Sequence, residues 1–343
     1  MPHTAAVRSA AIGSRVNSGE YRPAWWLPGG HLKTLWGKLA RLRPRVATRR
    51  ERWQTPDGDF IDLHRLEADP GSPRLLILHG LEGSARSHYA LGMLEQARLR
   101  GWASDVLVFR SCGGEPNQTA RFYHSGETTD LDLVVNRLTK MHSDSPLVLA
   151  GVSLGGNVLL KWLGERGNTL PTQVRGAAAV SVPFDLERGA RSIERGFSRV
   201  YQAHFLRSLK RKAMEKQERF PGLITADRLG HARTLFDFDD AVTAPVHGFL
   251  GASDYYHRSS SIRFLSQIRL PTLLLSAIDD PFLPPDVLEE VKDIAQDNPA
   301  LYVEFVRRGG HVGFISGALP WRPDYYAERR VVAFLGDHLP LGN

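Results

Sequence analysis

The sequence predicts an α/β protein in which a mostly parallel central sheet is flanked by helices. Short apolar runs alternate with longer amphipathic stretches along the 343 residues, which is the pattern of repeated strand–helix–strand units. No segment repeats with the period of a solenoid. Hydrophobic residues make up 42% of the chain and charged residues 24%. These are ordinary values for a globular protein, so the disordered and fibrous classes are excluded.

Short apolar runs mark the strands of this sheet. A first pair, at residues 52–54 and 60–66, flanks a turn with the sequence T-P-D-G, a typical turn composition. Six further runs have the apolar composition of strands that are buried on both faces. These runs cover residues 75–78, 103–109, 147–152, 177–182, 272–276 and 301–306.

Amphipathic stretches between the strands predict the helices. These stretches cover residues 88–100, 128–142, 157–165, 285–297 and 325–338. Connections of this length are typical of right-handed crossovers between parallel strands. We therefore expect helices on both faces of the sheet.

One long segment interrupts the alternation. Residues 184–269 contain no clear buried strand and are rich in Arg, Lys, Phe and Tyr. We expect a mainly helical cap here, inserted over one edge of a core domain made of residues 21–183 and 270–343, with residues 1–20 as an N-terminal tail. The aromatic residues of this cap either line an apolar pocket or pack its helices together. They are Phe184, Phe197, Tyr201, Phe205, Phe220, Phe236 and Phe238.

Ser153 is the strongest candidate for a catalytic residue. It lies in the sequence G-V-S-L-G at residues 151–155, between the predicted strand 147–152 and the predicted helix 157–165. In this context G-x-S-x-G is typical of the nucleophile elbow of the α/β-hydrolase fold, a strained turn that pushes the serine Oγ out of the sheet. The helix N-terminus also favours negative charge that develops nearby. We therefore predict that fold, with Ser153 as the nucleophile.

A second motif predicts the oxyanion hole. The sequence H-G-L-E-G at residues 79–83 follows the predicted strand 75–78 directly. In the α/β-hydrolase fold, the loop after this strand supplies one backbone N–H to the oxyanion hole, and the residue after the nucleophile supplies the other. We predict that Leu81 and Leu154 are these donors. His79 is expected to shape the loop rather than to exchange protons.

Two aspartates and a histidine complete the predicted site. Asp279 and Asp280 follow one predicted strand, and His311 follows the next, with glycines on both sides. Open α/β sheets place their sites at such strand ends, and the order Ser, Asp, His is that of α/β-hydrolases. We predict Asp280 as the acid because it precedes P-F-L-P, and the reverse assignment to Asp279 stays open. His311 is the predicted general base.

Composition argues against several other functions. The formal charge is +7, but the arginines are spread along the chain, so we expect a solvated basic surface and no nucleic-acid partner. No HExxH, GxGxxG or Walker A sequence occurs, so we expect no metal and no cofactor. The single cysteine, Cys112, fits a reducing compartment, and we expect a cytoplasmic protein. No apolar stretch is long enough to span a membrane, whereas peripheral membrane contact and the oligomeric state stay open.

Further motifs resemble the YheT-like branch of the α/β-hydrolases, which also includes the plant EMB8-like and the animal ABHD1/ABHD3-like proteins. The resemblance covers nearly all of the chain after residue 20. The chain has Lys33 where this family usually has a glutamine. Besides the sequences around the predicted oxyanion loop, elbow, aspartates and histidine, the matching segments are P-G-G-H-L-K-T-L at 28–35, F-R-S-C-G-G-E-P-N at 109–117, Y-H-S-G-E-T-T-D at 123–130, F-D at 236–237, D-Y-Y at 254–256 and S-S at 259–260.

The resemblance implies a carboxylic ester hydrolase with a Ser-Asp-His triad, acting on small-molecule esters with short- or medium-chain acyl groups or on lipid esters. An acyltransferase, which passes the same acyl-enzyme to an alcohol, is the first alternative. A non-catalytic binding protein on a hydrolase fold is an alternative of a different class, because fold does not fix function. Arg110 and residues 123–130 are expected to form scaffold around the site, since buried polar groups need partners.

Overall fold

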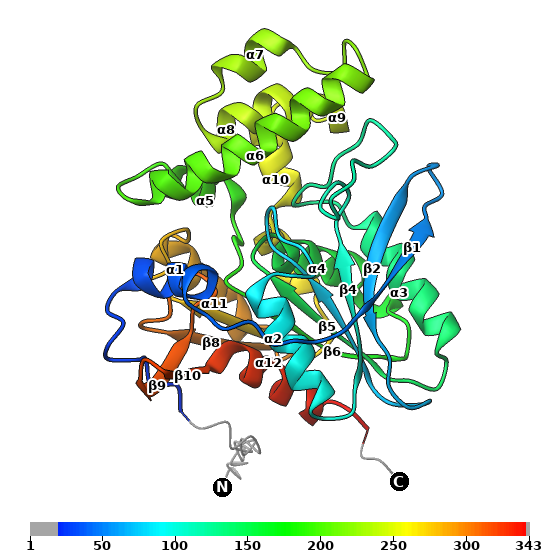
Figure 1. The fold of residues 1–343 in the computed structure, drawn as a ribbon, viewed down its shortest axis with the longest axis vertical. Helices are drawn as coiled ribbons and strands as arrows, with labels where there is room; N and C mark the ends of the chain where they lie inside the picture. The colour runs from blue at the N-terminus through cyan, green and yellow to red at the C-terminus, as the bar shows by residue number, and fades with distance from the viewer. Residues whose placement is uncertain (1–19, 341–343) are drawn as a thin grey trace, which may run out of the picture.

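An eight-stranded sheet is the centre of the computed structural model, which describes residues 20–340 (Figure 1). The strand order is β1-β2-β4-β3-β5-β6-β7-β8. The two pairs β1–β2 and β2–β4 are antiparallel, and the remaining pairs are parallel. The strands are β1 (Arg49–Gln54), β2 (Phe60–Leu66), β3 (Arg74–Leu78), β4 (Ala103–Val108), β5 (Leu147–Val152), β6 (Val174–Val180), β7 (Thr272–Ala277) and β8 (Leu301–Val306). The predicted α/β class with a mostly parallel sheet is confirmed. The predicted tail at residues 1–20 lies almost entirely outside the described residues.

The degree of burial explains why some strands have a clear pattern in the sequence and others do not. All residues of β3, β4, β5 and β7 are buried, which requires the continuous apolar runs seen in the sequence. The edge strand β1 exposes most of its residues and buries only Trp53. Its first half consists of charged residues that form ion pairs, such as Arg49 with Glu51. For this reason β1 begins three residues before the predicted start at residue 52.

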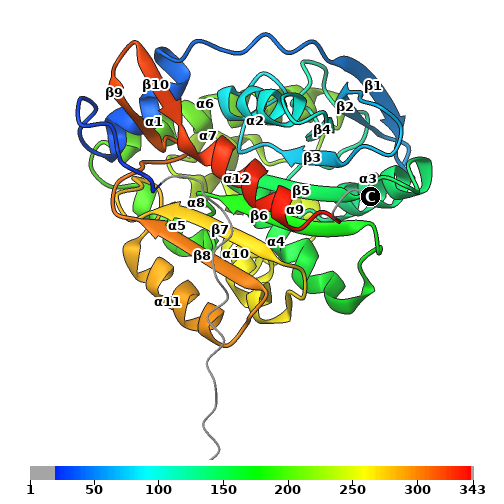
Figure 2. The same ribbon diagram turned by 90° about the horizontal axis from the view of Figure 1, so that it is seen from below.

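Helices cover both faces of the sheet (Figure 2). The helices α2 (His88–Arg98) and α12 (Tyr326–Asp337) pack on one face. The helices α3 (Thr129–Met141), α4 (Leu154–Arg166) and α11 (Pro285–Gln296) pack on the other. All five predicted helices are present, and none of the helices within residues 20–340 is long and apolar enough to cross a membrane.

Two elements near the chain ends carry no clear sequence signal. Helix α1 (Gly30–Leu39) contains glycines and a buried lysine, so it lacks a simple apolar stripe. The hairpin of β9 (Ile315–Leu319) and β10 (Arg322–Tyr325) is short and half-polar. Trp26 from the N-terminal segment donates its indole N–H to the carbonyl of Gly317 in this hairpin, at 3.0 Å. The N-terminal segment of the described chain is therefore packed against this hairpin.

Residues 184–269 contain helices and no strand. Figure 1 shows α5 to α9 stacked above the carboxyl ends of the strands. The chain enters and leaves this layer at one place: the N–H of Ile262 donates to the carbonyl of Phe184, and the N–H of Leu186 donates to Ser260 Oγ, both at 3.0 Å. The helices are α5 (Leu186–Ile193), α6 (Ser198–Arg219), α7 (Ala226–His231), α8 (Leu235–Phe238), the π-helix η2 (Asp239–Thr243), α9 (Ala244–His247), α10 (Ala252–Ser259) and the 3-10 helix η3 (Ser261–Gln267).

The predicted boundary of this helical layer at residue 269 rests on composition alone. Leu265 of η3 and the following Ile268 belong to the main core cluster beneath the sheet. A 3-10 turn that buries its apolar side chains in the core is part of the core domain. We propose that the cap comprises residues 186–260.

Buried charges join the loops around the sheet. The guanidinium of Arg110, of which 1% is exposed, donates to the carboxylates of Asp57 (2.8 Å), Asp59 (3.0 Å) and Asp130 (2.7 Å). A buried guanidinium needs such partners because its desolvation is costly. Arg110 therefore has the scaffold position expected from the sequence.

Candidate active site

Ser153 occupies a tight turn between β5 and α4. Its backbone has φ 54° and ψ −121°, a region that is strained for a residue other than glycine. The turn brings backbone segments so close that side chains are excluded beside it. A Cβ on Gly151 would lie 2.5 Å from the carbonyl oxygen of Gly155, and a Cβ on Gly155 would lie 2.4 Å from that of His79. The glycines of G-V-S-L-G are therefore required by contact with neighbouring backbone.

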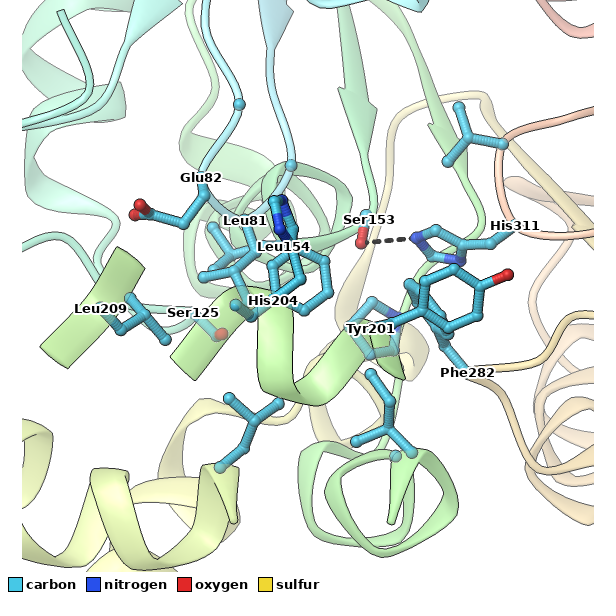
Figure 3. A pocket seen from close by; sticks show the side chains of 18 of the residues that line it. Leu81, Glu82, Ser125, Ser153, Leu154, Tyr201, His204, Leu209, Phe282 and His311 are labelled. Atoms are coloured by element: carbon cyan, nitrogen blue, oxygen red, sulfur yellow. Dashed lines mark hydrogen bonds between the residues drawn. The ribbon is translucent and has the colours of Figure 1, made fainter. Parts of the chain in front are cut away.

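The structure brings the three predicted residues into one hydrogen-bonded chain. Ser153 Oγ lies 3.0 Å from His311 Nε2 (Figure 3). On the other side of the ring, His311 Nδ1 lies 2.8 Å from Asp280 Oδ2. Side-chain burial is complete for Asp280 and about nine-tenths for His311. With the proton of neutral His311 on Nδ1, Asp280 accepts from the ring and Ser153 donates to it.

The adjacent aspartates have different partners. Asp280 faces the ring of His311, and its other oxygen accepts the N–H of Phe282 at 2.9 Å. Asp279 Oδ1 instead accepts the N–H groups of Gly309 (2.6 Å) and Gly310 (2.8 Å). The geometry thus assigns Asp280 to the imidazole and Asp279 to the backbone of the loop that carries it.

Helix α1 supports the same loop, which was not predicted from the sequence. The N–H of His311 donates to Thr34 Oγ1 at 2.9 Å, and Thr34 Oγ1 donates to the carbonyl of Gly30 at 2.8 Å. Gly310 has φ 63°, and a Cβ there would lie 2.4 Å from the carbonyl oxygen of Gly30. The only available signal was the motif at residues 28–35, which does not reveal where it packs.

Lys33, at the position where the family usually has a glutamine, is a structural residue of this segment. It is 1% exposed, and its Nζ donates to the carbonyl of Leu27 at 2.5 Å. Burial lowers the pKa of Lys33, and the nearby carboxylate of Asp279 partly offsets this effect. The lysine therefore holds the turn before α1 and does not line the cavity described below.

Two backbone amides beside Ser153 have no acceptor among residues 20–340. Leu81 and Leu154 both line the cavity at Ser153. The amides of Gly80 and Glu82, on either side of Leu81, donate to tyrosine hydroxyls at 2.8 and 2.9 Å. The amides of Leu81 and Leu154 make no hydrogen bond to any residue between 20 and 340. They are thus available to an oxygen atom bound next to the serine.

His79 fixes the start of this loop. It is completely buried, its Nδ1 lies 2.8 Å from the carbonyl of Gly80, and its Nε2 accepts the N–H of Phe109 at 3.1 Å. Burial lowers the pKa of His79 to about 4, so the ring stays neutral near pH 7. These contacts agree with the loop-shaping role expected for it.

Glu82 connects the same loop to the cap. Its backbone has φ 53°, and its carboxylate accepts from the hydroxyl of Tyr123 at 2.8 Å. From α6 of the cap, Lys212 donates to it at 2.7 Å and Ser208 Oγ donates to its other oxygen. The residue that follows Leu81 is therefore held by both the core and the cap.

A cavity of about 760 Å³ opens at Ser153 and His311. The size and the apolar wall are typical of small-molecule sites. The cap aromatics take both predicted roles, since four of the seven line the cavity and Phe184 packs in the core. The larger apolar side chains of the lining include Leu186, Ile193, Phe197, Tyr201, Phe205, Phe238, Val242, Phe282 and Leu283.

Between residues 20 and 340, no group of three or more His, Cys, Asp or Glu side chains is arranged to hold a metal ion.

Comparison with known proteins identifies the fold and the family. A family model described as the α/β-hydrolase fold matches residues 73–318. YheT of Escherichia coli, described as an inferred esterase, is 39% identical over 328 residues, which are 94% of this chain and 95% of that protein. The phospholipase ABHD3 of Mus musculus is 29% identical over 314 residues, 89% of this chain and 75% of that protein. The solved structure of the Pyrococcus furiosus esterase PF2001 shares the fold, with a TM-score of 0.55 and 16% identity over 87% of this chain and 97% of that one.

Half-buried His88, which lines the cavity, generates a prediction about acid stability. It packs under α1, where a Cβ on Gly37 would lie 2.4 Å from its ring. Its Nδ1 is buried and has no hydrogen-bond partner among the described residues. Burial, together with Arg41 and Arg43, lowers the pKa of His88 from 6.5 to about 3.

We expect His88→Leu to reduce the loss of stability in acid. Between pH 6.5 and 4 the unfolded chain binds a proton at His88 that the folded chain does not bind, so folding is disfavoured as the pH falls. The variant should gain up to about 1.4 kcal/mol relative to wild type for each unit of acidification. Urea unfolding across this pH range measures the effect, with the exposed His231→Leu as control. Parallel pH profiles for His88→Leu and wild type would contradict the prediction.

Proposed function

The chain belongs to the α/β-hydrolase family, which confirms the resemblance inferred from its motifs, and we propose that it hydrolyses carboxylic esters through an acyl-enzyme on Ser153. The observation that carries the proposal is the hydrogen-bonded chain from Ser153 through His311 to Asp280 at the wall of an apolar cavity. The names of the relatives, an inferred esterase and a phospholipase, also support ester hydrolysis.

In the proposed first step, Ser153 Oγ attacks the ester carbonyl carbon. Its proton moves to His311 Nε2, which lies 3.0 Å away. Asp280 accepts the Nδ1–H and stabilises the imidazolium that forms. The bond from oxygen to carbon and the proton transfer together give a tetrahedral intermediate with a negatively charged oxygen.

The oxyanion is proposed to bind the amides of Leu81 and Leu154. Neither amide has another acceptor in the described chain, and Leu154 is the first residue of α4, where the helix dipole favours negative charge. Each such donor contributes about 3 kcal/mol to transition-state stabilisation in comparable enzymes. The contacts of Glu82 with core and cap would keep Leu81 in place.

The remaining steps return the enzyme to its starting state. The imidazolium of His311 donates its Nε2 proton to the departing alkoxide, and the alcohol leaves. A water molecule then gives a proton to His311 and attacks the acyl-enzyme. Collapse of the second intermediate releases the carboxylic acid, and Ser153 regains its proton. Each proton that His311 accepts is therefore donated again within the cycle, and water is the only co-substrate.

The cavity suggests the substrate class. Apolar side chains from the core and the cap form most of its wall, which suits an acyl chain rather than a charged group. We propose esters with short- or medium-chain acyl groups, or lipid esters, as substrates. We also propose a cytoplasmic location. Its only support is the single cysteine of the chain.

Loss of the nucleophile is the first expected outcome. Ser153→Ala should lower the turnover of p-nitrophenyl esters by about 10⁴-fold or more and abolish labelling by a fluorophosphonate. Ser125 lines the same cavity, but the hydrogen bonds of the His311 ring go to Asp280 and Ser153, so Ser125→Ala should still be labelled stoichiometrically. Full labelling of the Ser153→Ala protein would refute the assignment.

Acyl-chain length should control affinity. Each methylene that enters the apolar cavity contributes about 0.8 kcal/mol, so KM should fall about fourfold per added carbon until the chain fills the cavity. A series of p-nitrophenyl esters measures this trend. Ile193 lines the cavity from α5, and Ile193→Trp should shorten the preferred chain. A KM that is independent of chain length would contradict binding of the acyl group in this cavity. In a separate experiment with added ethanol, formation of ethyl esters would indicate the acyltransferase alternative.

A further inference from the structure

The exposed residues of the cavity lining lie together around its opening, which we call the rim. The exposed lining residues come from α1, the loop after it, the loop before α2 and the first turns of α6. They are Lys38, Leu39, Arg43, Arg86, Phe197, Val200 and His204. The other lining residues are buried or half-buried, so the cavity opens to solvent between α1 and α6.

Direct contacts place α1 and α6 side by side at this rim. His31 Nδ1 lies 3.3 Å from the hydroxyl of Tyr201, and Lys38 Nζ lies 2.8 Å from His204 Nε2. Figure 1 shows α1 below the start of the cap. The core and the cap therefore present one continuous surface around the opening.

This surface carries large apolar side chains that contact water. Leu39 is 75% exposed, Leu42 is 91% exposed, and Phe197 and Val200 are 50% and 57% exposed. Exposed apolar residues are ordinary when they are scattered, whereas a cluster at the mouth of a cavity marks an interaction site. An apolar cluster around an acyl-binding cavity suits a partner that is itself apolar.

The same rim carries exposed cationic side chains. None of its basic side chains forms a salt bridge to a carboxylate among residues 20–340, whereas many other arginines of the described chain do, such as Arg98 and Arg188. Lys and Arg side chains near an anionic leaflet are attracted to it. The exposed cations of the rim are Lys38, Arg43 and Arg86.

We propose that this rim docks on the surface of an anionic phospholipid membrane. Apolar side chains beside unpaired cations are the pattern of proteins that lie on such surfaces. Leu39, Leu42 and Phe197 would enter the headgroup region while the cations bind lipid phosphates. The cavity would then open toward the bilayer, so that an acyl chain could pass to Ser153 without crossing water. Docking goes beyond the proposed hydrolysis and does not depend on it.

Vesicle co-sedimentation tests the docking separately from catalysis. The full chain carrying Ser153→Ala should sediment with vesicles of equal parts phosphatidylglycerol and phosphatidylcholine, bind phosphatidylcholine vesicles much more weakly, and be released by salt. In the same background, Leu39→Asp with Leu42→Asp, and separately Arg43→Glu with Arg86→Glu, should weaken binding by about tenfold or more.

Matched control variants keep the proposal falsifiable. Leu250→Asp changes a 97% exposed leucine of the cap outside the rim. Arg100→Glu with Arg175→Glu reverses two exposed charges near the amino ends of β4 and β6. Both controls should bind like the parent protein, and circular dichroism checks the fold of every variant. Absence of binding to anionic vesicles, or an equal loss in the rim and control variants, would overturn the proposal. A dimer that Leu39→Asp with Leu42→Asp disperses, without vesicle binding, would assign the rim to a second copy instead.

Discussion

The tight turn at Ser153 is the constraint on which the rest of the structure depends. Its positive φ can persist only because β5 and α4 fix the backbone on both sides. The close approach of Gly155 to the carbonyl of His79 then brings the loop after β3 next to the serine. One strained residue thereby sets the position of the nucleophile and of both candidate oxyanion donors, since strain of this kind is retained where the surroundings overdetermine it.

The histidine loop is placed by an independent set of contacts. Thr34 and Asp279 bind its backbone N–H groups, while Asp280 binds the imidazole. These partners come from α1 and from the end of β7, so the first described helix is part of the support of a residue far along the chain. The cap instead supports the loop after β3, through the contact of Lys212 with Glu82. Sites held by several rigid elements keep their geometry without reorganisation during a reaction.

Local patterns were sufficient to predict the sheet and its flanking helices and to single out Ser153 and His311 as candidates. Buried parallel strands need continuous apolar runs, and the elbow needs glycines, so both leave marks in the sequence. Helix α1 left no such mark because its role is a contact between Thr34 and His311, and sequence spacing does not report contacts of this range. The choice between Asp279 and Asp280 also required coordinates, since neighbouring residues on a loop can point to either side. The end of the cap depended on the packing of Leu265, which composition does not encode.

A crystal structure of the protein after reaction with a fluorophosphonate tests the central claim most directly. The proposed chemistry predicts phosphorus bonded to Ser153 Oγ, with the phosphoryl oxygen about 3 Å from the amide nitrogens of both Leu81 and Leu154. His311 should remain bound to Asp280. A phosphonyl group on another residue, or an oxygen directed away from both amides, would contradict the account.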